Sequence, residues 1–361
     1  MLNVLVVSQY IEPHTGGAER CMLEVCSRLK NRGINIGHLS AVGGNEKMIS
    51  PPLRFFSGGF HPFWPGQVDR VLRKLRPDII FAHFTVPGIV DIAIRRAEKM
   101  NIPVCLAYHS DITGPELHRK LLGNVYYRII GMRTLELAGR IIVSSPEYRS
   151  SSPWLAALHR QFDYVMPGVD PVMAKGRPSP SSPYLFFAGK TDLKSKGFDI
   201  LYRAWMSIKK EFPCLELVAA GTPSRQGAYP GVRFTGRVDS RQAMADLYTS
   251  AQVTVLPSTS NAESYGMVLA ESLVAGTPVV GSDIGGIPAL VRDGVNGCLA
   301  SPGNVQSLAR ALAKTLHHQD RLRANILAER EAYLRLFSWD NTTDRILQSL
   351  SACAGRPVNT K

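Results

Sequence analysis

Two glutamates, Glu263 and Glu271, lie on either side of a glycine that opens a helical pattern. The pattern begins at Gly266, shortly after the apolar run 253–256, so Glu263 precedes the helix and Glu271 lies inside it. Backbone amides at a helix N-terminus bind anions, and carboxylates accept hydrogen bonds from hydroxyl groups. The stretch therefore predicts a site for an anionic ligand that carries hydroxyl groups.

A second glycine-containing loop carries two lysines, Lys190 and Lys196. The first follows Gly189 at the end of an apolar strand pattern over 184–187, and the second precedes another helical pattern. Two cations beside a helix start suit a diphosphate, because point charges and amide donors act on the same oxygens. Loop lysines are usually only solvated, so their position at a strand end is what favours binding.

The first half of the chain offers two further positions of this kind. Gly16 and Gly17 separate a strand pattern over 2–7 from a helical pattern that runs to about residue 32. Such a turn opens a doubly wound α/β unit and can approach a ligand closely, although the glycines could simply form a tight turn. His109 and Asp111 follow the strand pattern 104–108, at the edge where such sheets collect ligands. A single histidine, however, is more often structural.

Short apolar runs alternate with helical patterns along both halves of the chain. This alternation predicts an α/β protein whose parallel sheets are covered by helices on both faces. Residues 167–170 and the Pro/Ser-rich stretch 176–183 indicate a linker between two such sets.

Two segments of the first half leave alternatives open. The Pro/Gly-broken segment 51–66 is predicted to be a loop, and its aromatic residues, which include Phe60 and Trp64, either pack beneath it or contact an acceptor or a membrane surface. The helical stretch 115–138 carries Arg119, Lys120, Arg128 and Arg133 among apolar residues. It is either a basic amphipathic face that lies on a membrane or an ordinary solvated helix.

Composition limits the class of protein. The 361 residues are 45% hydrophobic, no run reaches the roughly 18 apolar residues of a membrane span, and the N-terminus reads as a strand rather than a signal peptide. We therefore expect a cytoplasmic protein.

The net charge of +13 comes without a basic cluster, so a phosphorylated substrate or an anionic membrane explains it as well as nucleic acid does, and we expect no nucleic-acid partner. The six cysteines lack metal-ligand spacing, which favours buried, reduced thiols and no metal.

Taken together, these motifs resemble the retaining glycosyltransferases of the GT-B fold known as family four, or group 1. Glu263 and Glu271 match the E-x7-E signature of that family, and Gly189-Lys190 with Lys196-Gly197 matches its Gly-Arg/Lys…Lys-Gly element. Further matches are Gly16-Gly17, His109 and the element Gly168-Val169-Asp170. The resemblance spans almost the whole chain. It departs from the family at Lys190, where arginine is more common.

The resemblance implies two Rossmann-like domains that face a cleft. Residues 1–170 would form the acceptor-side domain, to which a C-terminal helix over 337–352 returns, and residues 171–336 would bind the nucleotide-sugar donor. The donor site would comprise Gly16, Gly17, Gly189, Lys190, Lys196, Glu263, Ser264, Tyr265, Gly266, Met267, Val268 and Glu271.

The same resemblance implies roles for single residues. The lysines would hold the diphosphate, Glu263 would contact the sugar and Glu271 the ribose, and the amides of 266–268 would meet phosphate. His109 would contact the transferred sugar; Asp111, Phe60, Trp64 and Arg119 are the acceptor-side candidates.

The implied reaction is transfer of a hexose from GDP-mannose or a UDP-sugar, without a metal or other cofactor, in bacterial surface polysaccharide or glycolipid synthesis. The acceptor would be a glycan or a polyprenyl-linked glycan, and the enzyme could contact an anionic membrane peripherally. No Asp-x-Asp pair is present to carry a divalent ion. Two alternatives remain open at this point: a nucleotide-sugar epimerase on the same fold, and a non-catalytic nucleotide-sugar binding protein.

Overall fold

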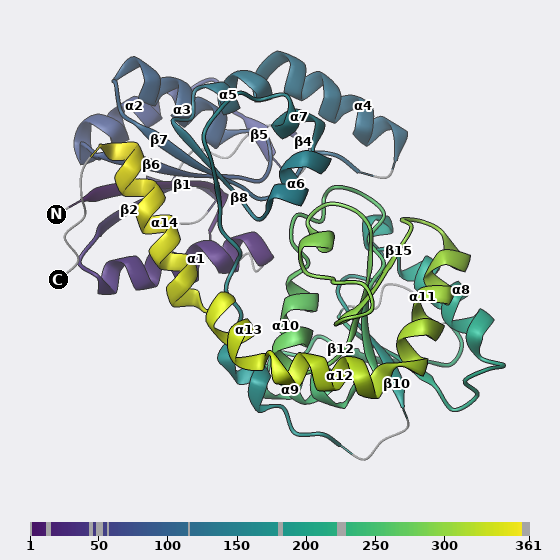
Figure 1. Cartoon of the computed structure of the whole chain (residues 1–361). Coiled ribbons are helices and arrows are strands. Elements are labelled where there is room, and N and C mark those ends of the chain that lie inside the picture. Colours follow the sequence, from purple (N-terminus) through teal and green to yellow (C-terminus); the bar gives the residue numbers. More distant parts are fainter. Residues whose placement is uncertain are drawn as a thin grey trace. The chain divides into compact units, whose positions relative to one another are not determined.

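The computed structural model describes residues 2–11, 16–42, 46–47, 53–55, 58–114, 116–179, 183–221 and 229–355, and only the backbone of 46–47 and 53–55. The chain divides into two compact units, each of which is described by itself (Figure 1). Unit 1 comprises Met1–Gly168 and Trp339–Lys361, and unit 2 comprises Val169–Ser338.

Unit 1 is built on a parallel sheet with the strand order β3-β2-β1-β6-β7-β8-β9. Its strands are β1 (Asn3–Tyr10), β2 (Asn35–Val42), β3 (Glu46–Lys47), β6 (Ile79–Phe84), β7 (Val104–Tyr108), β8 (Arg140–Val143) and β9 (Phe162–Tyr164). The central strands are buried along nearly their whole length, as expected for parallel strands covered on both faces.

Helices cover both faces of this sheet. One buried cluster joins the sheet to α1 (Gly17–Asn31) and α14 (Trp339–Ala354), and a second joins its other face to α2, α3 and the helices that follow β7 and β8. These are α2 (Trp64–Leu75), α3 (Ile89–Lys99), α4 (Leu117–Tyr126), the π-helical turn η1 (Tyr127–Gly131), α5 (Met132–Glu136), α6 (Pro146–Ser151) and α7 (Pro153–Ala156).

Local structure differs from the sequence prediction in two places. The segment 51–66 is not simply a loop: it contains the antiparallel pair β4 (Leu53–Phe55) and β5 (Gly58–Phe60), and α2 already begins at Trp64. After β8, where the apolar and polar pattern predicts one helix over about 146–160, the structure has two short helices, because Ser152 leaves helical geometry and caps α7, which starts at Pro153.

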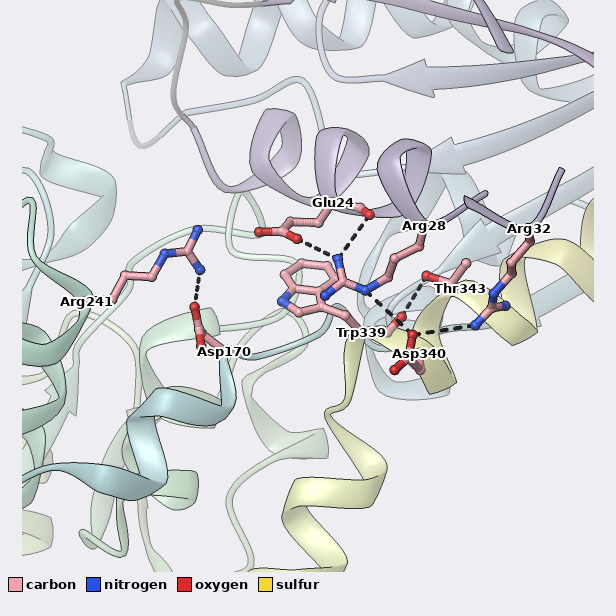
Figure 2. Close-up of polar contacts among 8 residues, drawn as sticks. All are labelled: Glu24, Arg28, Arg32, Asp170, Arg241, Trp339, Asp340 and Thr343. Atoms are coloured by element: carbon pink, nitrogen blue, oxygen red, sulfur yellow. Dashed lines mark hydrogen bonds and ion pairs between the residues drawn. The ribbon is translucent and has the colours of Figure 1, made fainter. Parts of the chain in front are cut away.

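Helix α14 returns to unit 1 and is fixed there by its first residues. The Trp339 side chain is 4% exposed, and a Cβ atom at Gly168 would lie 2.3 Å from its ring. The Arg28 guanidinium of α1 lies over this ring at 5.8 Å and pairs with Asp340 at 3.7 Å (Figure 2). Thr342 donates to the Met166 carbonyl at 2.8 Å. The helix therefore forms part of the core of unit 1.

Unit 2 has a parallel six-stranded sheet of order β12-β11-β10-β13-β14-β15. Its strands are β10 (Tyr184–Ala188), β11 (Glu216–Ala220), β12 (Val232–Gly236), β13 (Val253–Leu256), β14 (Val279–Ser282) and β15 (Gly297–Ala300). Its helices are α8 (Phe198–Ile208), α9 (Arg241–Ser250), α10 (Met267–Ala275), α11 (Val305–His317), α12 (Gln319–Ala328) and α13 (Arg330–Leu336). Short 3₁₀ turns are η2 (Pro171–Lys175), η3 (Lys194–Lys196) and η5 (Ile287–Ala289).

The described part of the Pro/Ser-rich stretch belongs to unit 2 and is not a free linker. The Arg177 amide donates to Asp246 at 2.8 Å, and the Ser179 amide donates to Ser250 at 2.9 Å, so both residues are held on α9. Asp170 pairs with Arg241 of the same helix (Figure 2).

Two predictions from composition can be compared with the structure. None of the helices in the described residues has the length and apolarity needed to cross a bilayer. All six cysteines are free thiols; four are buried as expected, Cys353 is half-buried and Cys214 is exposed.

Candidate functional site

The strand order of unit 2 changes direction between β10 and β13. These strands are neighbours, and the chain then proceeds outward to β11 and β12 on one side and to β14 and β15 on the other. Ligands of open parallel sheets bind outside the carboxyl ends of the strands at such a switch point. The loops that leave these two strands, 189–197 and 257–266, carry most of the predicted donor-binding residues.

The two loops are held together by backbone contacts. Thr259 donates from its amide to the Ser195 carbonyl at 2.9 Å and from its hydroxyl to the Lys194 carbonyl at 2.9 Å. Gly197 has φ +67°, and a Cβ atom there would lie 2.0 Å from the Pro257 carbonyl oxygen. Only glycine fits this position, which fixes the adjacent Lys196 beside the second loop.

Glu263 accepts three hydrogen bonds within this pair of loops. Lys196 Nζ lies 2.6 Å from Oε2, the Ser258 hydroxyl donates to the same oxygen at 3.3 Å, and the Gly266 amide donates to Oε1 at 3.1 Å. The pair is partly shielded, since the lysine side chain is 32% exposed and the glutamate side chain 13%. The structure thus brings Lys196, Glu263 and Gly266 together.

Helix α10 presents backbone donors at the same place. Gly266 caps it in the left-handed region at φ +87°, and the first helical bonds run from Leu269 and Ala270 to the Gly266 carbonyl. The amides of Met267 and Val268 find no acceptor in the part of the chain that the structure describes. Unpaired amides and the positive end of a helix dipole favour an anion at this position.

Other predicted donor residues are arranged differently. Glu271 is buried on α10 and accepts from the Tyr248 hydroxyl at 2.8 Å. Tyr265 is 2% exposed and its ring packs edge-on against Phe337, so its side chain belongs to the interior of unit 2. Gly189 ends β10 with φ +153°, and Lys190 beyond it is exposed to solvent.

Gly286 completes the loop geometry. Its amide donates to the Glu263 carbonyl at 3.2 Å, and a Cβ atom there would lie 1.9 Å from the carbonyl oxygen of Ser264. Gly286 and Ser258 were not among the predicted site residues. The sequence signal for Gly286 is the Gly285-Gly286 pair in the turn between β14 and η5.

In unit 1, the half-buried His109 pairs with the buried His83, which was not predicted. His83 ends β6, and its Nδ1 lies 2.8 Å from Nε2 of His109 in stacked rings with centroids 5.1 Å apart. Burial lowers the pKa of His109 to about 4, and it lowers the pKa of His83 well below its ordinary value. At neutral pH both rings are therefore uncharged, and one donates a hydrogen bond to the other.

Two acceptor-side predictions are corrected by the structure. The Asp111 carboxylate is 4% exposed and accepts from the Tyr108 and Ser152 hydroxyls, each at 2.7 Å, so it belongs to a buried network rather than to an open surface. Burial raises the pKa of this carboxyl group. Trp64 is 0% exposed in the first turn of α2 and packs in the core, so it cannot contact an acceptor.

The remaining predicted residues of unit 1 lie at or near the surface. Phe60 is half-buried at the end of β5, and Arg119 is exposed and pairs with Glu116 at 3.7 Å. Gly16 caps α1, and both Gly16 and Gly17 are exposed. A Cβ atom at Gly17 would meet nothing within 4 Å, so the structure leaves open space beside this backbone.

Comparison with known proteins gives matches over both units. The model of a family described as "Glycosyltransferase Family 4" matches residues 15–171, and one described as "Glycosyl transferases group 1" matches residues 182–318. The D-inositol 3-phosphate glycosyltransferase of Mycobacterium leprae is 29% identical over 311 residues, which are 77% of this chain and 70% of that protein.

Solved structures share the fold. Sucrose-phosphate synthase from Thermosynechococcus elongatus superimposes with a TM-score of 0.74 at 17% identity, over 96% of this chain and 98% of the other. Anabaena Alr3699/HepE in complex with UDP and glucose gives 0.73 at 17% identity, over 98% and 100% of the two chains. The architecture is therefore the GT-B fold, as predicted.

Proposed function

Because this chain belongs to the retaining GT-B glycosyltransferases of group 1, family four, we propose that it moves a hexose from GDP-mannose or a UDP-sugar to a sugar or lipid-linked sugar acceptor. That the protein is a retaining hexosyltransferase that uses a nucleotide sugar follows from the family. The identity of the donor and the acceptor is our proposal. UDP and glucose in the similar HepE structure support a UDP-sugar.

One observation carries the donor proposal: Lys196 pairs with Glu263 just before α10, at the switch point of the sheet, and the Met267 and Val268 amides that begin this helix have no acceptor among the described residues. A diphosphate placed there would receive the Met267 and Val268 amides and the lysine charge on the same oxygens. Lys190 and Gly189 would line the approach from β10. In this arrangement Glu263 positions Lys196 and keeps lone pairs for sugar hydroxyls, because each carboxylate oxygen accepts more than one hydrogen bond.

The chemistry requires stabilisation of a leaving group. The bond between the anomeric carbon and the diphosphate breaks, the diphosphate keeps the electron pair, and the acceptor oxygen forms the new bond on the same face of the sugar. Lys196 and the helix amides would meet the charge that develops on the diphosphate, and the acceptor proton would pass to the departing phosphate. We propose that this transfer needs no metal. For unit 1 we keep the prediction that Gly16, Gly17 and His109 contribute to the reaction.

For Glu271 we propose a bond to the donor ribose. Its Oε2 accepts from Tyr248, which orients the carboxylate from α9 on the donor-binding helix α10. For the acceptor we propose a glycan or a polyprenyl-linked glycan of a bacterial surface polysaccharide or glycolipid. A row of exposed apolar residues on α4 supports the lipid-linked form.

The test begins with thermal-shift screening of the purified chain against UDP-, GDP-, ADP- and dTDP-sugars, followed by release of the nucleoside diphosphate from the sugar that binds. Lys196→Met should weaken donor binding roughly 10- to 100-fold, because a hydrogen bond to a charged group contributes about 1.5–3 kcal/mol. Lys210→Met is the matched control, since Lys210 is an exposed lysine just beyond α8 and outside the site. Equal binding by both variants would refute the placement of the diphosphate.

A further inference from the structure

The ring of His109 is held from the neighbouring strand by two contacts. The backbone amide of His109 donates to the Phe84 carbonyl at 3.1 Å, and its Nε2 lies 2.8 Å from Nδ1 of His83. Both partners belong to β6, which pairs in parallel with β7. The two imidazole rings are stacked, with 13° between their planes. The orientation of the His109 ring is therefore fixed, and Nδ1 is the nitrogen that the contact with His83 leaves available.

The hydrogen bond between the two rings allows two arrangements of the protons, because burial lowers the pKa of both groups and leaves them uncharged at neutral pH. Either His83 donates from Nδ1 to His109, or His109 donates from Nε2 to His83. A neutral imidazole carries a single ring proton, so the second arrangement requires the proton of His83 to lie on its Nε2. The bond made by one ring nitrogen thus determines whether the other nitrogen of that ring is protonated.

The surroundings of His83 favour the first arrangement. His83 is 3% exposed, and its Nε2 has no hydrogen-bond partner among the described residues. The ring of Phe81 lies nearby, with 4.4 Å between the centroids, but an aromatic ring is only a weak acceptor for an N–H group. A proton on Nε2 would therefore be a buried donor without a good acceptor, which is rarer in proteins than a buried acceptor without a donor. A bare Nε2 avoids this cost, so His83 carries its proton on Nδ1 and donates to His109.

His109 then carries its own proton on Nδ1. This nitrogen makes no hydrogen bond within the described part of the chain. The half-buried ring lies just past the end of β7, at the edge where open sheets collect ligands. An Nδ1–H group can donate a hydrogen bond but cannot accept one. His109 therefore suits an oxygen atom of a bound ligand, and it cannot take a proton from an acceptor hydroxyl through this nitrogen.

We propose that His83 is a positioning residue: it donates from Nδ1 to Nε2 of His109 and so holds His109 in the tautomer that offers Nδ1–H to an oxygen of the transferred sugar. The tautomer follows from contacts within unit 1 alone, whereas the bond to the sugar rests on the function proposed above. A neutral donor at this position agrees with passage of the acceptor proton to the departing phosphate.

Nitrogen NMR of the full wild-type chain, labelled with nitrogen isotope in the histidine rings, tests the tautomer without any ligand. Protonated and bare ring nitrogens have well-separated chemical shifts, and the signals that vanish in His83→Leu and in His109→Gln assign the two rings. At neutral pH, Nδ1 should be protonated and Nε2 bare in both residues. Because the measurement uses the wild-type chain, it decides the tautomer even if a variant does not fold.

Release of UDP from UDP-glucose tests the positioning role. His83→Leu should lower kcat about tenfold with little change in KM, because the hydrogen bond that orients His109 is lost. His83→Asn should restore most of the activity, since its amide N–H can replace the donor at Nδ1. His83→Leu/His109→Gln should be no slower than His109→Gln alone, because His83 acts only through His109. His38→Leu is the matched control: His38 is a buried histidine of β2 in the same sheet and has no hydrogen bond to His109, so kcat should stay at the wild-type value.

Three outcomes overturn the proposal. The first is a proton on Nε2 of His109 in the wild-type chain. The second is a His83→Leu enzyme with the kcat of the wild type, or one that His83→Asn does not improve upon. The third is an equal loss of kcat in His38→Leu, which would assign the effect to packing of the sheet. A wild-type chain that releases no UDP would instead contradict the proposed donor, and the NMR result then decides this inference alone.

Discussion

Gly286→Ala should strongly reduce activity although alanine is compatible with the backbone conformation there. Gly286 has φ −92°, so a side chain introduces no strain of its own. The obstacle is space, because the new Cβ atom would lie 1.9 Å from the Ser264 carbonyl oxygen and 2.6 Å from its carbon. Both are backbone atoms of the loop that joins Glu263 to the start of α10, so no rotamer change can relieve the overlap.

The size of the effect follows from that distance. A carbon and an oxygen that are not bonded rarely approach closer than about 3 Å, so the 263–266 loop must move by about 1 Å, and such a misplacement can cost about 100-fold in rate. We expect kcat/KM for the nucleotide sugar to fall about 100-fold. The free energy of unfolding should fall by only about 1–3 kcal/mol, as for other overpacked positions.

The assay compares kcat/KM, donor affinity and thermal midpoint for Gly286→Ala and Gly66→Ala. Gly66 lies exposed in α2, and a Cβ atom there would meet nothing within 4 Å. Its replacement should leave activity unchanged and stabilise the chain slightly, because alanine favours a helix by up to about 1 kcal/mol. A Gly286→Ala enzyme with kcat/KM within about twofold of the wild type would refute the claim that this loop must hold its position.

Three further predictions concern unit 1. Because burial lowers the pKa of His109 to about 4, the unfolded chain binds more protons than the folded chain between that value and 6.5, and the free energy of unfolding should fall as pH falls from 6.5 to 4. The free energy of unfolding lost through this group is on the order of 3 kcal/mol. Urea titrations at pH 7 and pH 4.5 should therefore give free energies of unfolding that differ less in His109→Gln than in the wild type. Asp111→Ala should cost about 2–4 kcal/mol in urea unfolding, because it removes the acceptor to which the buried Tyr108 and Ser152 hydroxyls donate. Asp111→Asn should cost less, since an amide oxygen still accepts, and equal losses in the two variants would contradict this. Trp339→Ala should cost about 3–5 kcal/mol, because its ring packs on Gly168 in the core of unit 1, and an unchanged thermal midpoint would show that the ring is dispensable.

Much of the fold follows from local pattern. Apolar runs of four or five residues at 104–108 and 253–256 predicted β7 and β13 with their observed bounds, because a fully buried parallel strand reads as a continuous apolar run. Strand β15 was not predicted, since its sequence Gly-Cys-Leu-Ala offers only a weak run next to a glycine turn. The β4–β5 pair was predicted as a loop because Gly58 and Gly59, which disfavour a strand on propensity, make up two of the three residues of β5.

The site could be predicted only where its signal is local. The spacing of Glu263, Gly266 and Lys196 relative to strand ends is visible in the sequence, and the structure brings these residues together. The contact between His83 and His109 is tertiary: the residues lie 26 apart and meet only because β6 and β7 are neighbours. The burial of Asp111 likewise depends on hydroxyl groups that distant segments supply, which no local pattern reveals.

The return of α14 to unit 1 also bears on how the protein is made. Synthesis releases the sheet of unit 1 first, but the buried cluster on one of its faces also contains Ile346, Leu347 and Leu350 of α14. The part of that face that α14 covers stays exposed to water until all of unit 2 has left the ribosome. We therefore expect unit 2 to complete its fold on the growing chain before unit 1 does. A nascent chain stalled before Trp339 would carry a sheet face that α1 covers and α14 does not, the state in which a chaperone would be needed.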